Sequence, residues 1–154
     1  MNALIISAVW GVVMMFSTLF TSDKKIIRGF AVVGMVILLV ATIAEMMGYS
    51  IFNIDTRGML SFDRFALLFN AILFGSTFIY FLLSAKDMEE VGKYYAEYFA
   101  LIFFILCGIS LATSFKSLLI LFLGIEIISI PLYILTGTDK RNLKSNEASL
   151  KYFL

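Results

Sequence analysis

The chain has 154 residues, of which 61% are hydrophobic and 15% are charged, and its formal net charge is +1. Soluble domains carry roughly 25% charged residues, so this composition excludes a soluble globular protein, and the near-zero charge gives no reason to expect nucleic-acid binding. Only helices and closed barrels satisfy their backbone groups in lipid. Because the apolar runs are long and do not alternate with polar residues, they predict an all-α, polytopic transmembrane helix bundle.

The residue types that the chain lacks narrow the chemistry further. It has no histidine, so it offers no imidazole ligand to zinc or haem, and we expect no metal site. Its one cysteine, Cys107, lies inside an apolar run, which excludes an internal disulfide and favours a packing role. Any redox chemistry is therefore expected in partner proteins, and we assign no catalytic residue to this chain.

Five segments are long enough to span a bilayer, which takes about 20 residues. A sixth helix is predicted to begin near Glu147, but the eight residues from there to Leu154 are too few to span. The chain is thus expected to end inside a helix, as a fragment or a split chain would, and to form one membrane domain over residues 1–154. The five predicted spans cover residues 3–20, 27–47, 65–84, 95–113 and 118–136.

The distribution of Lys and Arg predicts the orientation, because cytoplasmic loops are enriched in these residues. The first, third and fifth connections carry eight of them, whereas the opposite side carries three, so we expect the N terminus outside and the odd-numbered loops in the cytoplasm. The eight are Lys24, Lys25, Arg28, Lys86, Lys93, Lys140, Arg141 and Lys144; the three are Arg57, Arg64 and Lys116.

One predicted span, with the run LFLGIEIISIPLYIL at residues 121–135, carries a carboxylate at its centre. Glu126 is the ninth residue of this span, where a charged side chain costs about 2.5–3.5 kcal/mol on insertion scales and tends to mark function. The alternative is a protonated glutamate that hydrogen-bonds a neighbouring helix as a structural link. Pro131 predicts a kink that leaves the carbonyl of Ile127 without its amide partner, and with Ser129 and Gly124 nearby this favours a small hydrated pocket.

Two further charged residues are candidates. Glu97 lies in the first turn of the fourth span, where a carboxylate stabilises the helix dipole, so capping and function are equally good interpretations. Lys151 lies in the sixth helix, and antiparallel packing would leave it about 7 Å from Glu126 along the helix axes, at 1.5 Å per residue. A direct or water-bridged pair is one interpretation, and a lysine that reaches out to the cytoplasmic face is the other.

The run LFLGIEIISIPLYIL, followed by SNEASLKYFL, resembles the fifth and sixth helices of subunit N of respiratory complex I, the proton-pumping NADH:quinone oxidoreductase. The run EYFALIFFILCGISLATS at residues 97–114 is similar to the fourth helix of that family. The first three spans fit it in number and hydropathy rather than in motif. In the related subunits L and M a tryptophan usually precedes the glutamate, and Ile125 stands there in this chain.

The resemblance implies a proton-translocating subunit that couples quinone reduction elsewhere in the assembly to proton transfer, with Glu126 and Lys151 at the family's proton-transfer positions. It implies no cofactor in this chain, although the assembled complex would use NADH and quinone. Its partners would be other complex I membrane subunits, including related antiporter-like ones, in a bacterial inner membrane. Alternatives are a subunit of a multisubunit cation/proton antiporter or of a membrane-bound hydrogenase, and a non-catalytic membrane scaffold.

Overall fold

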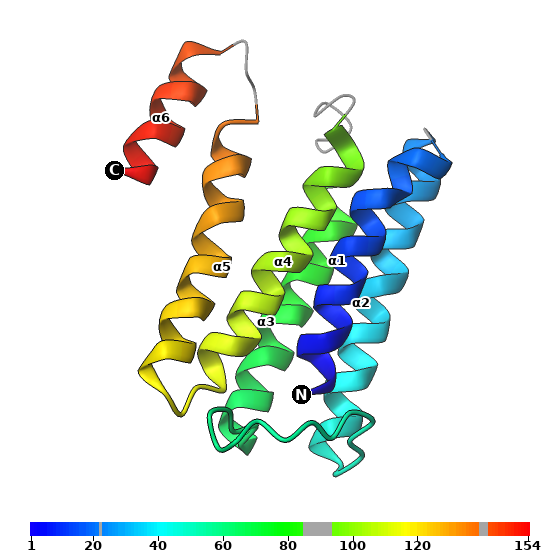
Figure 1. The fold of residues 1–154 in the computed structure, drawn as a ribbon. Coiled ribbons are helices and arrows are strands. Elements are labelled where there is room, and N and C mark those ends of the chain that lie inside the picture. Colours follow the sequence, from blue (N-terminus) through cyan, green and yellow to red (C-terminus); the bar gives the residue numbers. More distant parts are fainter. Residues whose placement is uncertain (22, 85–93, 139–141) are drawn as a thin grey trace.

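The computed structural model describes residues 1–154 with the exception of residues 22, 85–93 and 139–141. The described parts are helical, and α5 lies between the bundle formed by the first four helices and the short sixth helix (Figure 1). The helices are α1 Asn2–Phe20, α2 Lys24–Met46, α3 Arg64–Leu83, α4 Tyr95–Thr113, α5 Leu118–Thr136 and α6 Leu143–Phe153.

The structure confirms the predicted all-α class. Helices α1 to α5 are long and apolar enough to cross a membrane, and their ends lie within three residues of the predicted spans. The prediction for the sixth helix was wrong at its start, because α6 begins at Leu143 rather than near Glu147. The side chain of Asn142 accepts a hydrogen bond of 3.0 Å from the backbone amide of Lys144. Such an N-cap starts the helix one turn before Glu147.

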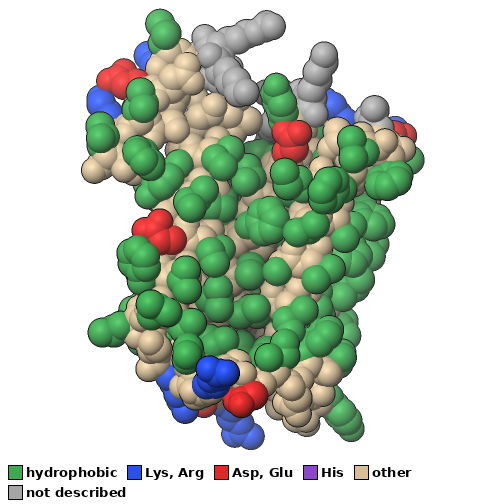
Figure 2. Space-filling model, in the orientation of Figure 1, with side chains coloured by type: hydrophobic (Ala, Val, Ile, Leu, Met, Phe, Trp, Pro, Cys, Tyr) green, Lys and Arg blue, Asp and Glu red, His purple; other side chains and the backbone are tan. Residues whose placement is uncertain are grey.

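Charged side chains lie mainly at the two ends of the bundle, and hydrophobic side chains cover the face between them (Figure 2). Lys24, Lys25 and Lys144 lie at the end where α2 and α6 begin (Figure 1). The opposite end holds Arg64 and Lys116, beside α3 and α5. Four residues of the charge count, Lys86, Lys93, Lys140 and Arg141, are outside the described residues. The separation of basic residues follows the prediction, and the orientation in the membrane remains a prediction.

Helix α4 is at the centre of the packing. Half of the residues in its most apolar stretch are buried, whereas only 11% are buried in that of α5. Phenylalanine rings fill the contact between α3 and α4: the rings of Phe81 and Phe99 meet edge to face with centroids 4.8 Å apart. Edge-to-face pairs suit the ring quadrupole and contribute about 0.5–1.5 kcal/mol beyond their buried area. Helix α4 also packs closely against α1 and α5, so it is the helix on which α5 is placed.

Backbone hydrogen bonds join two connections at the end of the bundle where α5 begins. The amide of Ser61 donates to the carbonyl of Ser114 at 2.7 Å, and the amide of Lys116 donates to the carbonyl of Met59 at 2.9 Å. At the same end Glu45 accepts hydrogen bonds from the Met1 amine and from the amide of Asn2. Glu45, near the end of α2, therefore serves the local structure.

Candidate functional site

The packing of α5 against α4 determines where Glu126 points. A Cβ atom on Gly124 would stand only 2.8 Å from the backbone nitrogen of Ala112 in α4, so Gly124 faces α4 at very close approach. Residues two apart in a helix are separated by roughly 200° around its axis. Glu126 therefore projects from the side of α5 that is turned away from α4, where it is half-buried.

Pro131 lies on a different side of α5 from Glu126, whereas Ser129 lies near Glu126 on the helix surface, three residues further along. Pro131 is buried and lies seven residues after Gly124, so it shares the face that packs on α4. The hydroxyl of Ser129 donates to the carbonyl of Ile125 at 2.8 Å, within its own helix. Gly124 is the close-approach point that the sequence suggested. Gly124 and Pro131 face α4 whereas Glu126 faces away from it, and a hydrated pocket beside Glu126 stays a prediction. Helix α5 continues through Pro131, and a kink there stays a prediction.

Within the described residues, neither an ion pair nor a hydrogen bond involves the carboxylate of Glu126. Lys151, the cation that the sequence suggested as a partner of Glu126, is paired with another residue. Its Nζ lies 2.6 Å from Oε1 of Glu147, one turn earlier in α6. In the same described part of the chain, no three His, Cys, Asp or Glu side chains gather as metal ligands would. The site thus holds an unpaired carboxylate on α5 and a separate ion pair on α6.

The heights of the two groups along α5 follow from the contacts between α5 and α6. The hydroxyl of Ser149 donates to the carbonyl of Tyr133 at 2.8 Å, which places these two residues at about the same level. Glu126 is seven residues from Tyr133 and Lys151 is two residues from Ser149. At 1.5 Å per residue, about 7 Å of axial offset remains between Glu126 and Lys151. The axial offset matches the expectation, but the contact does not form, because Lys151 projects from a different side of α6.

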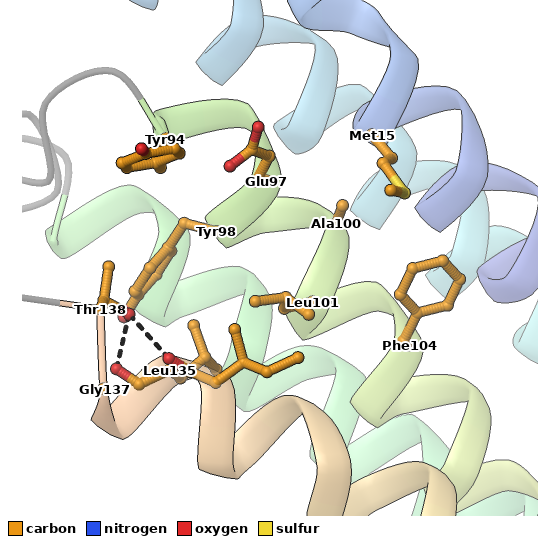
Figure 3. A pocket seen from close by; sticks show the side chains of 11 residues that line it. Met15, Tyr94, Glu97, Tyr98, Ala100, Leu101, Phe104, Leu135, Gly137 and Thr138 are labelled. Carbon is orange, nitrogen blue, oxygen red and sulfur yellow. Dashed lines mark hydrogen bonds between the residues drawn. The ribbon is translucent and has the colours of Figure 1, made fainter. Parts of the chain in front are cut away.

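Glu97 lines a pocket of about 270 Å³ at the end of the bundle where α4 begins and α5 ends (Figure 3). The carboxylate lies in the first turn of α4, which agrees with a helix-dipole role. Gly137 lines the same pocket and is eleven residues from Glu126, or roughly 16 Å along the helix axis. The pocket and Glu126 are thus separate features. The pocket is otherwise lined by Met15, Tyr94, Tyr98, Ala100, Leu101, Phe104, Ile134, Leu135 and Thr138.

Two polar relationships were missed by the sequence-based reasoning. Glu147 was not singled out, although a Glu four residues before a Lys on a helix predicts their ion pair. Asn70 was not singled out either; it is almost fully buried, and Thr113 of α4 donates to its Oδ1 at 3.1 Å. A lone asparagine in an apolar run was the available signal, because buried amides need a partner.

These features define a polytopic α-helical membrane protein with an ionisable side chain in the middle of a span, on a face free of contact with the preceding helix. Comparison with known proteins narrows this class. A family model described as NADH:quinone oxidoreductase/Mrp antiporter matches residues 115–154, which contain α5 and α6. The chain belongs to the subunit N family of NADH-quinone oxidoreductases, as its relatives show over its whole length.

The relatives come from several bacteria. NADH-quinone oxidoreductase subunit N of Cytophaga hutchinsonii is 34% identical, and that of Flavobacterium psychrophilum is 32% identical. Both matches cover 100% of this chain and 33% of the relative, so the chain spans about a third of their length. Subunit N 1 of Koribacter versatilis is 38% identical over 63% of this chain and 19% of its own length.

Proposed function

We propose that this chain is part of a proton-translocating membrane subunit of a bacterial NADH-quinone oxidoreductase, and that Glu126 and Lys151 take part in the proton transfer. The subunit N relatives support the assignment to this enzyme. The chain itself has no histidine and a single cysteine, so oxidation of NADH and reduction of quinone would take place in other subunits of the assembly, in the bacterial inner membrane. Its partners would be the other membrane subunits, including related antiporter-like ones.

The observation that carries the proposal is the position of Glu126. It is the ninth of the 19 residues of α5, and it faces away from α4 without a polar partner in the described structure. A carboxylate at this depth is tolerated as the neutral acid or beside a cation, so its protonation responds to the groups that approach it. That property is what a proton-transfer step requires.

Substitution Glu126→Gln in the assembled enzyme tests the proposal, because glutamine keeps the size and hydrogen-bonding capacity of glutamate but cannot ionise. In proteoliposomes we expect NADH-driven proton uptake to fall roughly tenfold, equivalent to about 1.4 kcal/mol. Asp63→Asn is the matched control, since Asp63 is exposed at the end of the bundle and should be dispensable. Full pumping in Glu126→Gln would reject proton transfer at Glu126 and favour the scaffold.

A second candidate is a subunit of a multisubunit cation/proton antiporter, and the name of the matched family model, which includes the Mrp antiporter, favours it. The two functions differ in the reaction that drives proton transport. An antiporter would exchange protons for sodium or potassium without NADH, whereas the proposed enzyme would require NADH and quinone. Proton movement measured in the same vesicles with a sodium gradient alone separates the two. Cation/proton exchange that proceeds without NADH and is lost in Glu126→Gln would support the antiporter.

A further inference from the structure

The ion pair on α6 is the starting point. Lys151 and Glu147 are four residues apart, and their Nζ and Oε1 atoms are 2.6 Å from each other. A Glu that precedes a Lys by four residues is the favourable order for a helical ion pair. The side chains are 74% and 63% exposed in this chain. Such a pair is weak when water surrounds it, so its importance depends on which way it faces and what lies beside it.

The contacts of α6 with α5 show which way the pair faces. Ser145 and Ser149 donate to the carbonyls of Thr136 and Tyr133, at 2.6 and 2.8 Å. The rings of Tyr152 and Phe153 also pack on Tyr133. At 100° per residue, Lys151 lies roughly 140° and Glu147 roughly 175° from the centre of this α5-facing side. The ion pair is therefore on the far side of α6 from α5.

Leucines surround the ion pair on that far side. Leu143, Leu150 and Leu154 are 84%, 64% and 101% exposed. With Glu147 they recur at intervals of four, three and four residues, which places them in one stripe along the helix. In a helix that lies beside a membrane span, such a stripe faces lipid or another protein segment rather than bulk water. In those surroundings a charge is stable only with a partner, so Glu147 and Lys151 depend on each other.

We propose that Glu147 is the positioning residue for Lys151: it holds the ammonium on the face of α6 turned away from Glu126, so that Lys151 is coupled to Glu147 rather than to Glu126. This inference rests on the proposed function, because it assigns the partner of one of the two proposed proton-transfer residues. Glu126 and Lys151 then act as separate stations of the path. The close Glu126–Lys151 contact suggested by sequence is replaced by the pair within α6.

Two double-mutant cycles in the assembled NADH-quinone oxidoreductase test the inference, with NADH-driven proton uptake by proteoliposomes as the readout. The first combines Glu147→Gln with Lys151→Met, and the second combines Glu126→Gln with Lys151→Met. We expect Glu147→Gln to lower pumping to within roughly twofold of the level of Lys151→Met, and their combination to lose no more than the worse single variant. In the second cycle the losses should multiply.

Two further variants separate positioning from a general effect on α6. Glu147→Asp keeps the carboxylate and should recover most of the pumping that Glu147→Gln loses. Lys144→Met removes another exposed cation of α6 and should leave pumping unchanged. The amount of assembled complex is measured for every variant. Pumping is expressed per assembled complex, so that a loss of assembly is not taken for a loss of proton transfer.

The outcomes distinguish the inference from the function on which it rests. If Glu126→Gln and Lys151→Met reduce pumping while Glu147→Gln does not, the inference is overturned and the proposed function stands. If Lys151 couples to Glu126 as strongly as to Glu147, the inference is likewise overturned, in favour of the direct pair. If neither Glu126→Gln nor Lys151→Met affects pumping, the proposed function itself fails.

Discussion

Gly108 of α4 and Gly124 of α5 lie directly against each other: a Cβ atom on Gly108 would stand 2.9 Å from the carbonyl oxygen of Gly124 and 3.0 Å from the backbone nitrogen of Ile128. Small residues at a helix crossing let two backbones approach closely, which is a main source of helix association in membranes. This crossing sets the rotation of α5 and thereby turns Glu126 away from α4. The fit of two glycines thus controls the position of the carboxylate.

Gly124→Ala should destabilise the α4–α5 crossing, because the new Cβ would meet backbone atoms of Ala112 that have no freedom to rotate away. We expect a loss of about 1–3 kcal/mol in the free energy of unfolding, as for other overpacked contacts. Detergent-induced unfolding followed by circular dichroism measures it. Gly75→Ala in α3 is the matched control, since nothing lies within 4 Å of its added Cβ. Equal stability of the two variants would contradict the crossing described here.

Asn70→Leu should weaken the contact between α3 and α4, because it removes the one acceptor of the Thr113 hydroxyl that lies in α3, and leaves the carbonyls of Ile109 and Ser110 in α4. Hydrogen bonds between membrane helices contribute about 0.6 kcal/mol on average and about 1.7 kcal/mol at most. We expect the free energy of unfolding to fall by an amount in that range, measured as for Gly124→Ala. Ser76→Ala is the control: the Ser76 hydroxyl bonds within α3, to the carbonyl of Leu73. The hydrogen bond is confirmed if Thr113→Val lowers the free energy of unfolding by less in the Asn70→Leu variant than in the native protein.

Ser149→Ala should loosen α6 from α5 without affecting the five spans. The substitution removes the 2.8 Å hydrogen bond to the carbonyl of Tyr133, which is worth about 1 kcal/mol. Hydrogen exchange of the α6 amides should therefore speed up by roughly fivefold, since 1.4 kcal/mol corresponds to a factor of ten. Ala148→Ser, which adds a hydroxyl at an exposed neighbouring position, should leave exchange unchanged. Faster exchange throughout α5 as well would show that the helices separate as one unit.

The orientation derived from basic residues can be tested by labelling single cysteines in intact cells. A cysteine at Lys144, just inside the capped start of α6, should react only with membrane-permeant maleimides, because we place this end in the cytoplasm. A cysteine at Asn53, in the exposed connection at the other end, should react with impermeant reagents. The native Cys107 is buried and should contribute little background. The opposite labelling pattern would reverse the topology.

Composition and hydropathy were sufficient to predict the number and ends of the membrane helices, because lipid forces each long apolar run to satisfy its own backbone hydrogen bonds. Glu126 could be found for the same reason: in the middle of such a run it has no route to water. The start of α6 was predicted four residues late, since its first turn holds a single apolar residue, Leu143, and Asn142 determines the start through a cap. The start of this short helix depends on a local hydrogen bond that hydropathy does not register.

Which side chains of different helices meet was decided by tertiary structure alone. Sequence spacing gave the axial offset of Glu126 and Lys151 correctly, because it depends only on the rise per residue and on antiparallel packing. It could not give the rotation of each helix about its own axis. That rotation comes from Gly124 packing on Ala112 and from Ser149 binding Tyr133. Both are contacts between helices; they turn Glu126 away from α4 and place the Glu147–Lys151 pair on the side of α6 that faces away from α5.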